Sequence, residues 1–436
     1  MERTLVFETI KKIGERVRIL GWVDSIRDHG KLVFLDVRDR SGILQAVVSK
    51  ELLKEGLREE DVVELEGKIK KRPEKNVNPK LETGEVEMEV EFLKVISSAK
   101  KLPFDLKNLK LSLPKMLDWR PLCLKNEKQR AIFKVQAAIV DGFRKACQKM
   151  GFLEFQSPIL VKEATEGGAE VFEVNYFGKQ AYLAQSPQLY KQILVASFER
   201  VFCVCRAFRA EPSETTRHLA EFTSLDCEVG FVEELQELLK ITEAIFVEIF
   251  KEVKENCQKE MEILNFFVPK VKEIPQLKFF EAKEILAKRI SKAQKEKLDL
   301  DPEEEREICN FSKERFDSEL IFVTHFPLAK RPFYTLPDPK NPQLSLSFDL
   351  LFRGLEVVSG GLRISNYQQL IEAMKRHGLD PKNFKFYLKA FAYGMPPEGG
   401  FGIGLERLTK QLLNLENVRE ATLFVRDLKR IDLRIK

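Results

Sequence analysis

The sequence is poor in cysteine, and its cysteines are not spaced for metal binding. Seven cysteines are scattered over 436 residues, and no two of them form a CxxC pair. This usage excludes a disulfide framework and argues against a zinc site. Charged residues interrupt every apolar stretch well before 18 residues, which excludes a transmembrane helix. The N-terminal segment has no apolar signal core, so we expect a cytoplasmic protein without a membrane partner.

Several common catalytic motifs are also missing. The chain has no GxxxxGKS or GxxxxGKT phosphate loop and no HExxH metal motif. Gly400, Gly402 and Gly404 have the wrong spacing for a dinucleotide-binding fingerprint, and a Glu-Arg pair follows them at once. None of the four histidines lies near a serine or cysteine in a recognised nucleophile motif. These absences argue against a nicotinamide enzyme and against covalent catalysis.

What is present is an ordinary globular composition. Apolar residues make up 44% and charged residues 32% of the chain, and the formal net charge is +5. The length predicts two or three domains with a large core. A mildly positive net charge permits a nucleic-acid partner but does not demonstrate one.

The pattern of the chain predicts two unlike halves and an α+β fold. Five β-rich runs within residues 1–100, with a helical interruption over 50–59, predict a small closed barrel of the oligonucleotide-binding (OB) kind. Residues 101–126 are polar and punctuated by proline, and are interpreted as a connector. Over 127–436, amphipathic helices (one of them at about 233–261) alternate with antiparallel-type strands.

Arginines on strand-like segments are the first candidates for chemistry. In FRAEPSETTRHLAEF, Arg209 ends an apolar strand, Arg217 and His218 follow across a polar loop, and Phe222 lies just beyond. A guanidinium binds phosphate oxygens in pairs, and an aromatic ring offers a face to a purine. The alternative for any one arginine is a surface ion pair of little energetic weight.

Two further clusters follow. If the chain turns at 353–354, Asp349 and Glu356 project from one face of a hairpin, where Mg²⁺ bridging phosphates would offset their repulsion. An ordinary charged hairpin is the alternative. In GGFGIGLERLTKQLL, glycines would allow a ligand to approach the backbone before Arg407 opens a helix. Tight strand–helix packing explains a single glycine equally well.

Together these segments resemble the three signature motifs of the class II aminoacyl-tRNA synthetases. GFLEFQSPIL, ending at Pro158, is similar to the first motif, FRAEPSETTRHLAEF to the second and GIGLER to the third. The order and separations match as well, and a barrel before the catalytic domain is typical of the aspartate, asparagine and lysine subgroup. The resemblance implies an OB-fold anticodon-binding domain over 1–100, a catalytic domain of antiparallel sheet and flanking helices over 127–436, ATP and Mg²⁺, and a homodimer.

Within this subgroup the chain resembles the aspartate enzymes of the short archaeal type, because no room exists for the large bacterial insertion. AQSPQLYKQ places Lys191 where these enzymes hold a cation for the substrate side-chain carboxylate, and Arg363 matches the second carboxylate-binding position. The resemblance therefore implies activation of L-aspartate by ATP to aspartyl-adenylate. Transfer to tRNA(Asp) would follow, and transfer to tRNA(Asn) is left open.

The resemblance also assigns roles to individual residues. Arg209 would hold the α-phosphate, and Arg209 and Arg407 would carry catalysis. The implied ATP-binding residues are Arg209, Glu211, Arg217, His218, Phe222, Glu356 and Arg407, with Phe222 stacking on adenine against Arg407. The implied metal ligands are Asp349, Glu356 and Ser359. The implied aspartate-binding residues are Glu170, Ser186, Gln188, Lys191, Asp226, Ser359 and Arg363, and the implied anticodon-reading residues are Phe34, Gln45 and Glu87.

Three alternatives stay open. An asparaginyl-tRNA synthetase is disfavoured mainly by Lys191. A non-catalytic tRNA-binding paralogue would require eroded motifs, and a ligase acting on a small molecule would not need the barrel. The chain also departs from the family at Glu398, where a histidine or another neutral group is expected, and at Asp24 in the barrel, which bears on tRNA choice.

Overall fold

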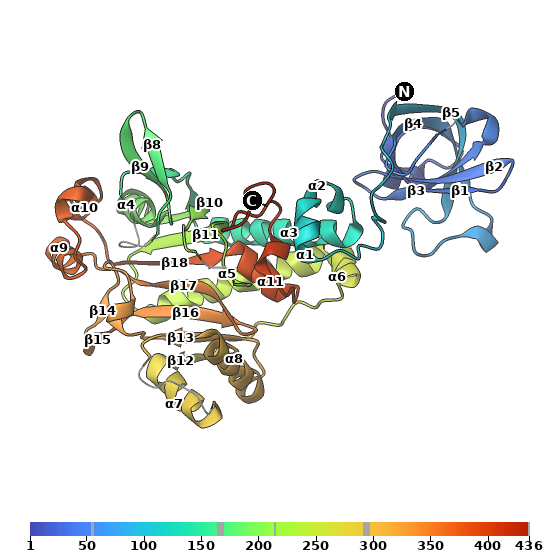
Figure 1. Cartoon of the computed structure of the whole chain (residues 1–436). Helices are drawn as coiled ribbons and strands as arrows, with labels where there is room; N and C mark the ends of the chain where they lie inside the picture. Colours follow the sequence, from blue (N-terminus) through green and yellow to red (C-terminus); the bar gives the residue numbers. More distant parts are fainter. Residues whose placement is uncertain (54–55, 164–169, 213–214, 291–296, 435–436) are drawn as a thin grey trace. The chain divides into compact units, whose positions relative to one another are not determined.

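The computed structural model describes residues 1–53, 56–163, 170–212, 215–290 and 297–434. The chain divides into two compact units, Met1–Leu109 and Lys110–Lys436. Figure 1 shows a barrel in the first unit and a broad sheet with helices in the second. No helix in the described ranges has the length and apolar character needed to cross a membrane.

The first unit is a closed five-stranded barrel, as the sequence predicts. Its strands follow the order β1-β2-β3-β5-β4 around the barrel. Apolar residues alternate along each strand and fill the interior, as Val33, Leu35 and Val37 do on β2. The helix expected over 50–59 is only a 3-10 turn, Lys50–Leu52, in the described part of that segment. The strands are β1 (Arg16–Asp28), β2 (Leu32–Arg38), β3 (Ile43–Ser49), β4 (Val62–Lys71) and β5 (Val86–Ser97).

The second unit is built on an eight-stranded sheet in the order β12-β13-β16-β17-β18-β11-β10-β6. The strands pair antiparallel throughout, except for the outer pairs β12–β13 and β10–β6. This confirms the α+β class. The strands are β6 (Leu153–Glu154), β10 (Arg200–Phe208), β11 (Glu221–Gly230), β12 (Gln276–Lys278), β13 (Leu320–Thr324), β16 (Ser347–Phe352), β17 (Leu355–Leu362) and β18 (Glu398–Gly404).

The two faces of this sheet have different roles. Helices α3 (Glu127–Lys149) and α5 (Leu235–Asn256) pack on one face and form the main core with alternate residues of the strands. On the opposite face, α7 (Phe279–Arg289) and α8 (Pro302–Phe316) form a second core with β13 and β16. Figure 1 shows this pair beside the β12–β13 end of the sheet. The middle of that face is left for polar side chains.

Smaller elements surround the sheet. The long helix expected at about 233–261 is divided at Cys257 into α5 and α6. The remaining helices are α1 (Leu113–Asp118), α2 (Arg120–Cys123), α4 (Gln188–Phe198), α6 (Gln258–Leu264), α9 (Tyr367–Arg376), α10 (Lys385–Ala392) and α11 (Leu405–Leu412). The short strands β7 (Leu160–Val161), β8 (Glu173–Tyr176) and β9 (Lys179–Leu183) form one small sheet, and β14 (Pro337–Asp338) pairs with β15 (Asn341–Ser345).

Part of the segment interpreted as a connector is helical and belongs to the second unit. A proline in the first turn favours the start of both α1 and α2. The guanidinium of the buried Arg120 donates to the carbonyl oxygens of Thr422 at 2.6 Å and Leu423 at 2.9 Å. These bonds join the start of the unit to the C-terminal segment of the chain, a long-range contact that polar composition alone does not reveal.

Close contact between α3 and α5 depends on Gly142. A Cβ atom at this position would lie 2.7 Å from the Cα atom of Ile249 and 3.1 Å from the Cβ atom of Glu252. The backbones of the two helices therefore approach more closely than any side chain would permit, and the core behind the sheet depends on that approach.

We expect Gly142→Ala to lower the free energy of unfolding by about 1–2 kcal/mol, because the overpacking penalty exceeds the gain in helix propensity. Urea denaturation measures the change. Asp141→Ala, at the exposed neighbouring position, is the control and should stay within about 0.5 kcal/mol of the wild type. A Gly142→Ala protein more stable than the wild type would show that the two helices can separate freely.

Candidate functional site

A cavity of about 210 Å³ lies on the open face of the second unit's sheet. Strands β11, β17 and β18, helices α4 and α11 and the loop after β10 contribute to its walls. The cavity brings together most of the site residues predicted from the sequence. These are Ser186, Gln188, Lys191, Arg209, Glu211, Arg217, His218, Phe222, Asp226, Glu356, Ser359, Arg363 and Arg407.

Arg209 and Phe222 meet at one wall of the cavity. The Cζ atom of Arg209 lies 5.3 Å from the centre of the Phe222 ring, within the range of a cation–π contact. Arg209 also has Nη1 3.9 Å from Oε1 of Glu211. The sequence interpretation placed an adenine between Phe222 and Arg407, and both of these residues line the cavity.

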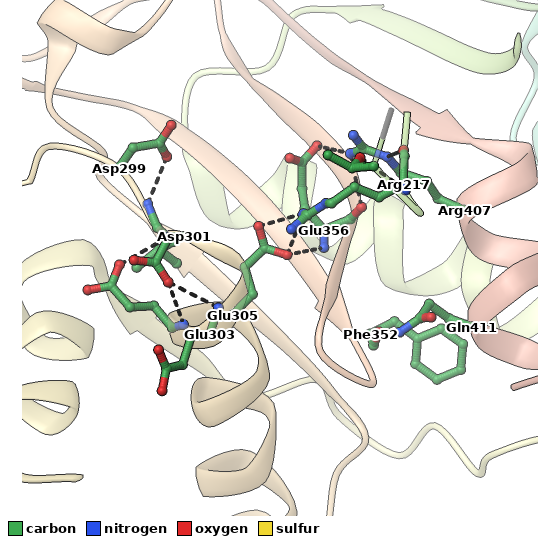
Figure 2. Close-up of polar contacts among 12 residues, drawn as sticks. Arg217, Asp299, Asp301, Glu303, Glu305, Phe352, Glu356, Arg407 and Gln411 are labelled. Carbon is green, nitrogen blue, oxygen red and sulfur yellow. Dashed lines mark hydrogen bonds and ion pairs between the residues drawn. The ribbon is translucent and has the colours of Figure 1, made fainter. Parts of the chain in front are cut away.

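A second group of charges lies at the start of α11, shown in Figure 2. Nη1 of Arg407 donates to the carbonyl oxygen of Glu356 at 3.3 Å and lies 3.4 Å from its Oε1. Nη2 of Arg217 contacts both carboxylate oxygens of Glu305, at 2.7 and 2.6 Å. Burial raises the pKa of Glu305 to about 7, against the opposing effect of Arg217. Burial and the nearby Arg407 lower the pKa of His218, which is therefore neutral at neutral pH.

At the other end of the cavity, four buried charges form a compact cluster. Nζ of Lys191 on α4 lies 2.8 Å from Asp226 and 3.0 Å from Glu228, while Nε of Arg363 lies 2.7 Å from Glu228. Burial lowers the pKa of Lys191, but Asp226 and Glu228 more than offset this, so the ammonium keeps its proton. Burial raises and the two cations lower the pKa of Glu228, with a net decrease. Glu228 is therefore ionised between two cations, and the cluster contains two carboxylates and two cations.

Behind this cluster, a buried chain of amides leads to Glu398. Gln192 donates from Nε2 to Oε1 of Glu398 at 2.8 Å. Oε1 of Gln192 accepts from Gln188 at 2.9 Å and from the Tyr387 hydroxyl at 3.1 Å. Oε2 of Glu398 is buried and has no hydrogen-bond partner among the described residues. Burial, reinforced by the charge of Glu228, raises the pKa of Glu398 well above its usual value.

The predicted hairpin has the turn that the sequence suggested. Phe352 pairs with Leu355, so the turn falls at Arg353-Gly354. An irregularity in the register between Leu350 and Leu351 leaves Val357 without a partner, as in a β-bulge. As a result, Glu356 and Ser359 project from the same face as Asp349, although they are three residues apart on one strand.

The three predicted metal ligands have unequal freedom. Nη2 and Nη1 of Arg331 contact the two oxygens of Asp349 at 2.8 and 3.1 Å, and Nη1 also donates to Ser359 at 3.2 Å. A guanidinium therefore already occupies the space between Asp349 and Ser359. Glu356 lines the cavity with a side chain that is 33% exposed. Among the described residues, no three Asp, Glu, His or Cys side chains are grouped to hold a metal alone.

This arrangement fits Mg²⁺ only as a partner of phosphate. Mg²⁺ usually takes one or two protein carboxylates and completes its shell with water and phosphate oxygens. Glu356 can supply such a carboxylate. Asp349 could contribute its carboxylate and Ser359 its hydroxyl only after Arg331 moves away.

Among the site residues predicted for the second unit, Asp349 and Glu170 do not line the cavity. The carbonyl oxygen of Glu170 accepts from the backbone of Ala210 at 2.9 Å, so Glu170 lies next to Arg209, and its side chain is exposed. In the sequence, Glu170 ends the segment TEGGAE (165–170), which we interpret as a loop, and residues 165–169 lie outside the described residues.

The glycines before Arg407 are needed for close approach. A Cβ atom on Gly400 would lie 1.9 Å from Oε2 of Glu228, and one on Gly402 would lie 3.2 Å from Oδ2 of Asp226. Side chains at these positions would displace the two carboxylates that hold Lys191. The structure thus gives β18 a role in the buried charge cluster rather than in simple strand–helix packing.

Four residues of the site were missed from the sequence: Gln192, Glu228, Glu305 and Arg331. Glu228 follows Asp226 by two residues, so strand alternation places both on one face and could have identified it. Gln192 lies one residue after Lys191. Glu305 and Arg331 come from segments without a distinctive pattern. Only the three-dimensional fold places Arg331 in the cavity wall and Glu305 against Arg217.

The barrel carries the other predicted residues on its outer face. Gln45 donates to Glu87 at 2.9 Å, and Phe34 lies on β2 with the same outward alternation as Asp36. Arg27, which the sequence analysis did not select, donates to both oxygens of Asp36, at 2.6 and 2.9 Å, and to Gln45 at 3.1 Å. These residues form one polar surface beside the half-buried Phe34, whose ring contacts that of His29 edge-on with 5.3 Å between the ring centres.

Comparison with protein families gives two matches that together span both units. Residues 113–428 match the family described as tRNA synthetases class II (D, K and N). Residues 17–96 match the OB-fold nucleic acid binding domain.

Full-length relatives agree with these matches. The chain is 41% identical to the aspartate–tRNA(Asp/Asn) ligase of Aeropyrum pernix and 39% identical to the aspartate–tRNA(Asp) ligase of Pyrococcus furiosus, over 96% of each chain. Its structure superposes on asparaginyl-tRNA synthetase from Pyrococcus horikoshii complexed with asparaginyl-adenylate with a TM-score of 0.89, at 32% identity over 99% of both chains. With its OB-fold barrel and its antiparallel catalytic sheet, the chain belongs to the class II tRNA synthetases of the aspartate, lysine and asparagine group.

Proposed function

We propose that this protein is an aspartate–tRNA ligase. It would activate L-aspartate with ATP and transfer the aspartyl group to the 3′ end of tRNA. The observation that carries the proposal is the pair of buried cations, Lys191 and Arg363, at one end of a cavity whose other end is lined by arginines. The end with Lys191 and Arg363 suits the side-chain carboxylate of aspartate, and the end lined by arginines suits the triphosphate of ATP. The names of the relatives, aspartate–tRNA ligases at about 40% identity, support the same substrates.

The reaction needs no protein nucleophile. The α-carboxylate of aspartate would attack the α-phosphorus of ATP, forming aspartyl-adenylate and releasing pyrophosphate. The terminal adenosine hydroxyl of tRNA would then attack the aspartyl carbonyl carbon and take the aspartyl group, with AMP as the leaving group. Arg209 would stabilise the charge that develops on the α-phosphate, while Arg217 and Arg407 would hold the outer phosphates. Glu356 would hold Mg²⁺, which would neutralise phosphate charge, and Asp349 and Ser359 would join it once Arg331 releases them.

Charge balance sets a condition for binding the side-chain carboxylate of aspartate. Lys191 and Arg363 are already balanced by Asp226 and Glu228, so the substrate carboxylate enters as the third anion. If Glu398 were ionised as well, it would add a fourth anion in a region with only two cations. A protonated Glu398 keeps the cluster able to accept an anionic side chain.

The barrel and the first motif support further parts of the proposal. The outer face with Phe34, Gln45 and Glu87 offers an aromatic ring and polar groups, which suit unstacked anticodon bases.

In the first motif segment, Leu153, Ile159 and Leu160 are 43–47% exposed, and β6 is an edge strand, as expected of a homodimer interface. Asp24 pairs with Arg38 and Lys107 and would influence the choice between tRNA(Asp) and tRNA(Asn). A cytoplasmic location fits this function.

The test is to follow labelled aspartate onto purified tRNA(Asp) and tRNA(Asn), with labelled asparagine as the control. Charging of tRNA(Asp) with aspartate is expected, and charging of tRNA(Asn) as well would identify a relaxed enzyme. Charging with asparagine would favour the alternative suggested by the structural similarity to asparaginyl-tRNA synthetase. No charging at all would favour a tRNA-binding paralogue.

Lys191→Met should raise KM for aspartate by about 100-fold and leave KM for ATP within about twofold, because it removes a cation from the amino-acid end alone. Aspartate-dependent ATP–pyrophosphate exchange measures both constants. The variant also leaves Asp226 and Glu228 without their ammonium partner, so circular dichroism must first show that it is folded. Equal increases in both KM values would contradict the assignment.

Glu398→Gln should change the pH dependence of stability. In the wild type the native state holds a proton on Glu398 that the unfolded chain releases above a pH of about 4.3, so stability falls as pH rises. The variant has no carboxyl group to titrate at this position, so it does not lose this stability. As the pH rises, the free energy of unfolding of the variant minus that of the wild type should therefore increase by up to about 1.4 kcal/mol per pH unit. Urea denaturation at pH 5, 6, 7 and 8 tests this, with the exposed Glu233→Gln as control. Parallel curves for wild type and Glu398→Gln would contradict a protonated Glu398.

A further inference from the structure

The contact between Glu305 and Arg217 joins a helix outside the three signature motifs to the phosphate end of the cavity. Glu305 lies in the first turns of α8, in the segment that packs against β13 and β16. Its side chain is 7% exposed, and that of Arg217 is 14% exposed. The ion pair is therefore largely desolvated, and it differs in this respect from the exposed pairs on the surface of the same helix.

Glu305 makes contacts with two different elements of the site. Its two carboxylate oxygens accept from Nη2 of Arg217, and its Oε2 also accepts from the backbone nitrogen of Glu356 at 3.1 Å. Figure 2 shows the carboxylate between these two partners. Only one of the three guanidinium nitrogens of Arg217 is used in this contact. The carboxylate thus fixes the direction of the arginine without occupying the whole of it.

Arg407 closes the arrangement from the other side. Its Nε lies 3.4 Å from the carbonyl oxygen of Arg217, and its Nη1 lies 3.3 Å from that of Glu356. Arg217, Glu356 and Arg407, which all line the cavity, are therefore linked to one another. Glu305 supports them from outside the cavity lining. The neighbouring Glu304 is bound instead to Lys283 of α7, at 2.7 and 2.8 Å, which anchors this turn of α8.

We propose that Glu305 is a positioning residue for the outer phosphates of ATP. It holds the Arg217 guanidinium and the Glu356 backbone in one fixed arrangement, so that the guanidinium and the Glu356 side chain are in place before the triphosphate binds. This inference rests on the proposed function, because it takes ATP as the ligand of this end of the cavity. It assigns to α8 a role in nucleotide binding that the signature motifs do not include.

Glu305→Gln tests the proposal at pH 8, above the pKa of the carboxyl group. The amide has nearly the same shape but offers one acceptor oxygen in place of two and has no charge. We expect affinity for ATP to fall about tenfold, the effect of one charge-assisted hydrogen bond. Affinity for AMP, which lacks the outer phosphates, and KM for aspartate should change by less than about twofold. Calorimetric titration with ATP and with AMP, together with ATP–pyrophosphate exchange, measures these values.

A matched control and a double mutant separate positioning from folding. Glu303→Gln removes a charge from the same helical turn at an exposed position and should leave both nucleotide affinities unchanged. In an Arg217→Ala background, Glu305→Gln should have almost no further effect on ATP affinity, because it acts through that arginine. Glu305→Asp keeps the charge and should restore part of the lost affinity.

Three outcomes would overturn the proposal. Equal losses for ATP and AMP would show a structural role, and unchanged affinities would show no role. Tighter ATP binding by Glu305→Gln would show that the contact withholds Arg217 from the nucleotide. If the wild type itself shows no aspartate-dependent exchange, the proposed function fails first, and titration with ATP against AMP still tests the role of Glu305.

Discussion

The buried ion cluster of Lys191, Asp226, Glu228 and Arg363 is the constraint on which the catalytic unit depends. Four charges lie almost without solvent on the open face of a sheet, where they pair with one another. Backbone carbonyl oxygens of Cys227, Phe401 and Gly400 accept further hydrogen bonds from the two cations. Removal of one partner would leave an uncompensated charge in the interior, which is among the most costly changes a protein can suffer. The strands that carry these residues must therefore keep their register, and glycines must replace side chains on β18 where the carboxylates lie.

The two ends of the cavity differ in how their cations contact carboxylates. The two cations and two carboxylates of the buried ion cluster are equal in number, and their paired atoms lie within 3.0 Å of one another. At the other end, Arg209, Arg217 and Arg407 each have one carboxylate partner, at 3.9, 2.6 and 3.4 Å. Arg209 and Arg407 are therefore held less tightly by carboxylates than Lys191 and Arg363, although both ends share one sheet.

Much of this could be predicted from the sequence, and the reasons differ between elements. The barrel follows from strict alternation of apolar residues, and the turn at Arg353-Gly354 follows from a glycine between two apolar strands. Lys191 and Arg209 were found because they lie in recognisable motifs. The bulge at Val357 could not be predicted, because the local sequence fits a regular hairpin as well as one with an extra residue in the second strand. Glu305 and Arg331 reach the site only through tertiary packing, and the short helices α1 and α2 depend on Arg120, whose partners lie some 300 residues away in the chain.

The contacts of the C-terminal segment have a practical consequence. The backbone nitrogen of Ala220 donates to the carbonyl oxygen of Arg426 at 2.9 Å, and Arg419 donates to the carbonyl oxygen of Thr215 at 2.9 Å. Ala220 in turn accepts from the backbone of Arg209 at 2.9 Å. The segment 419–426 therefore supports the loop that carries Arg209 and Arg217. Proteolytic trimming that removes this segment would deprive the cavity wall of its support, so truncated forms of the protein should be avoided in binding studies.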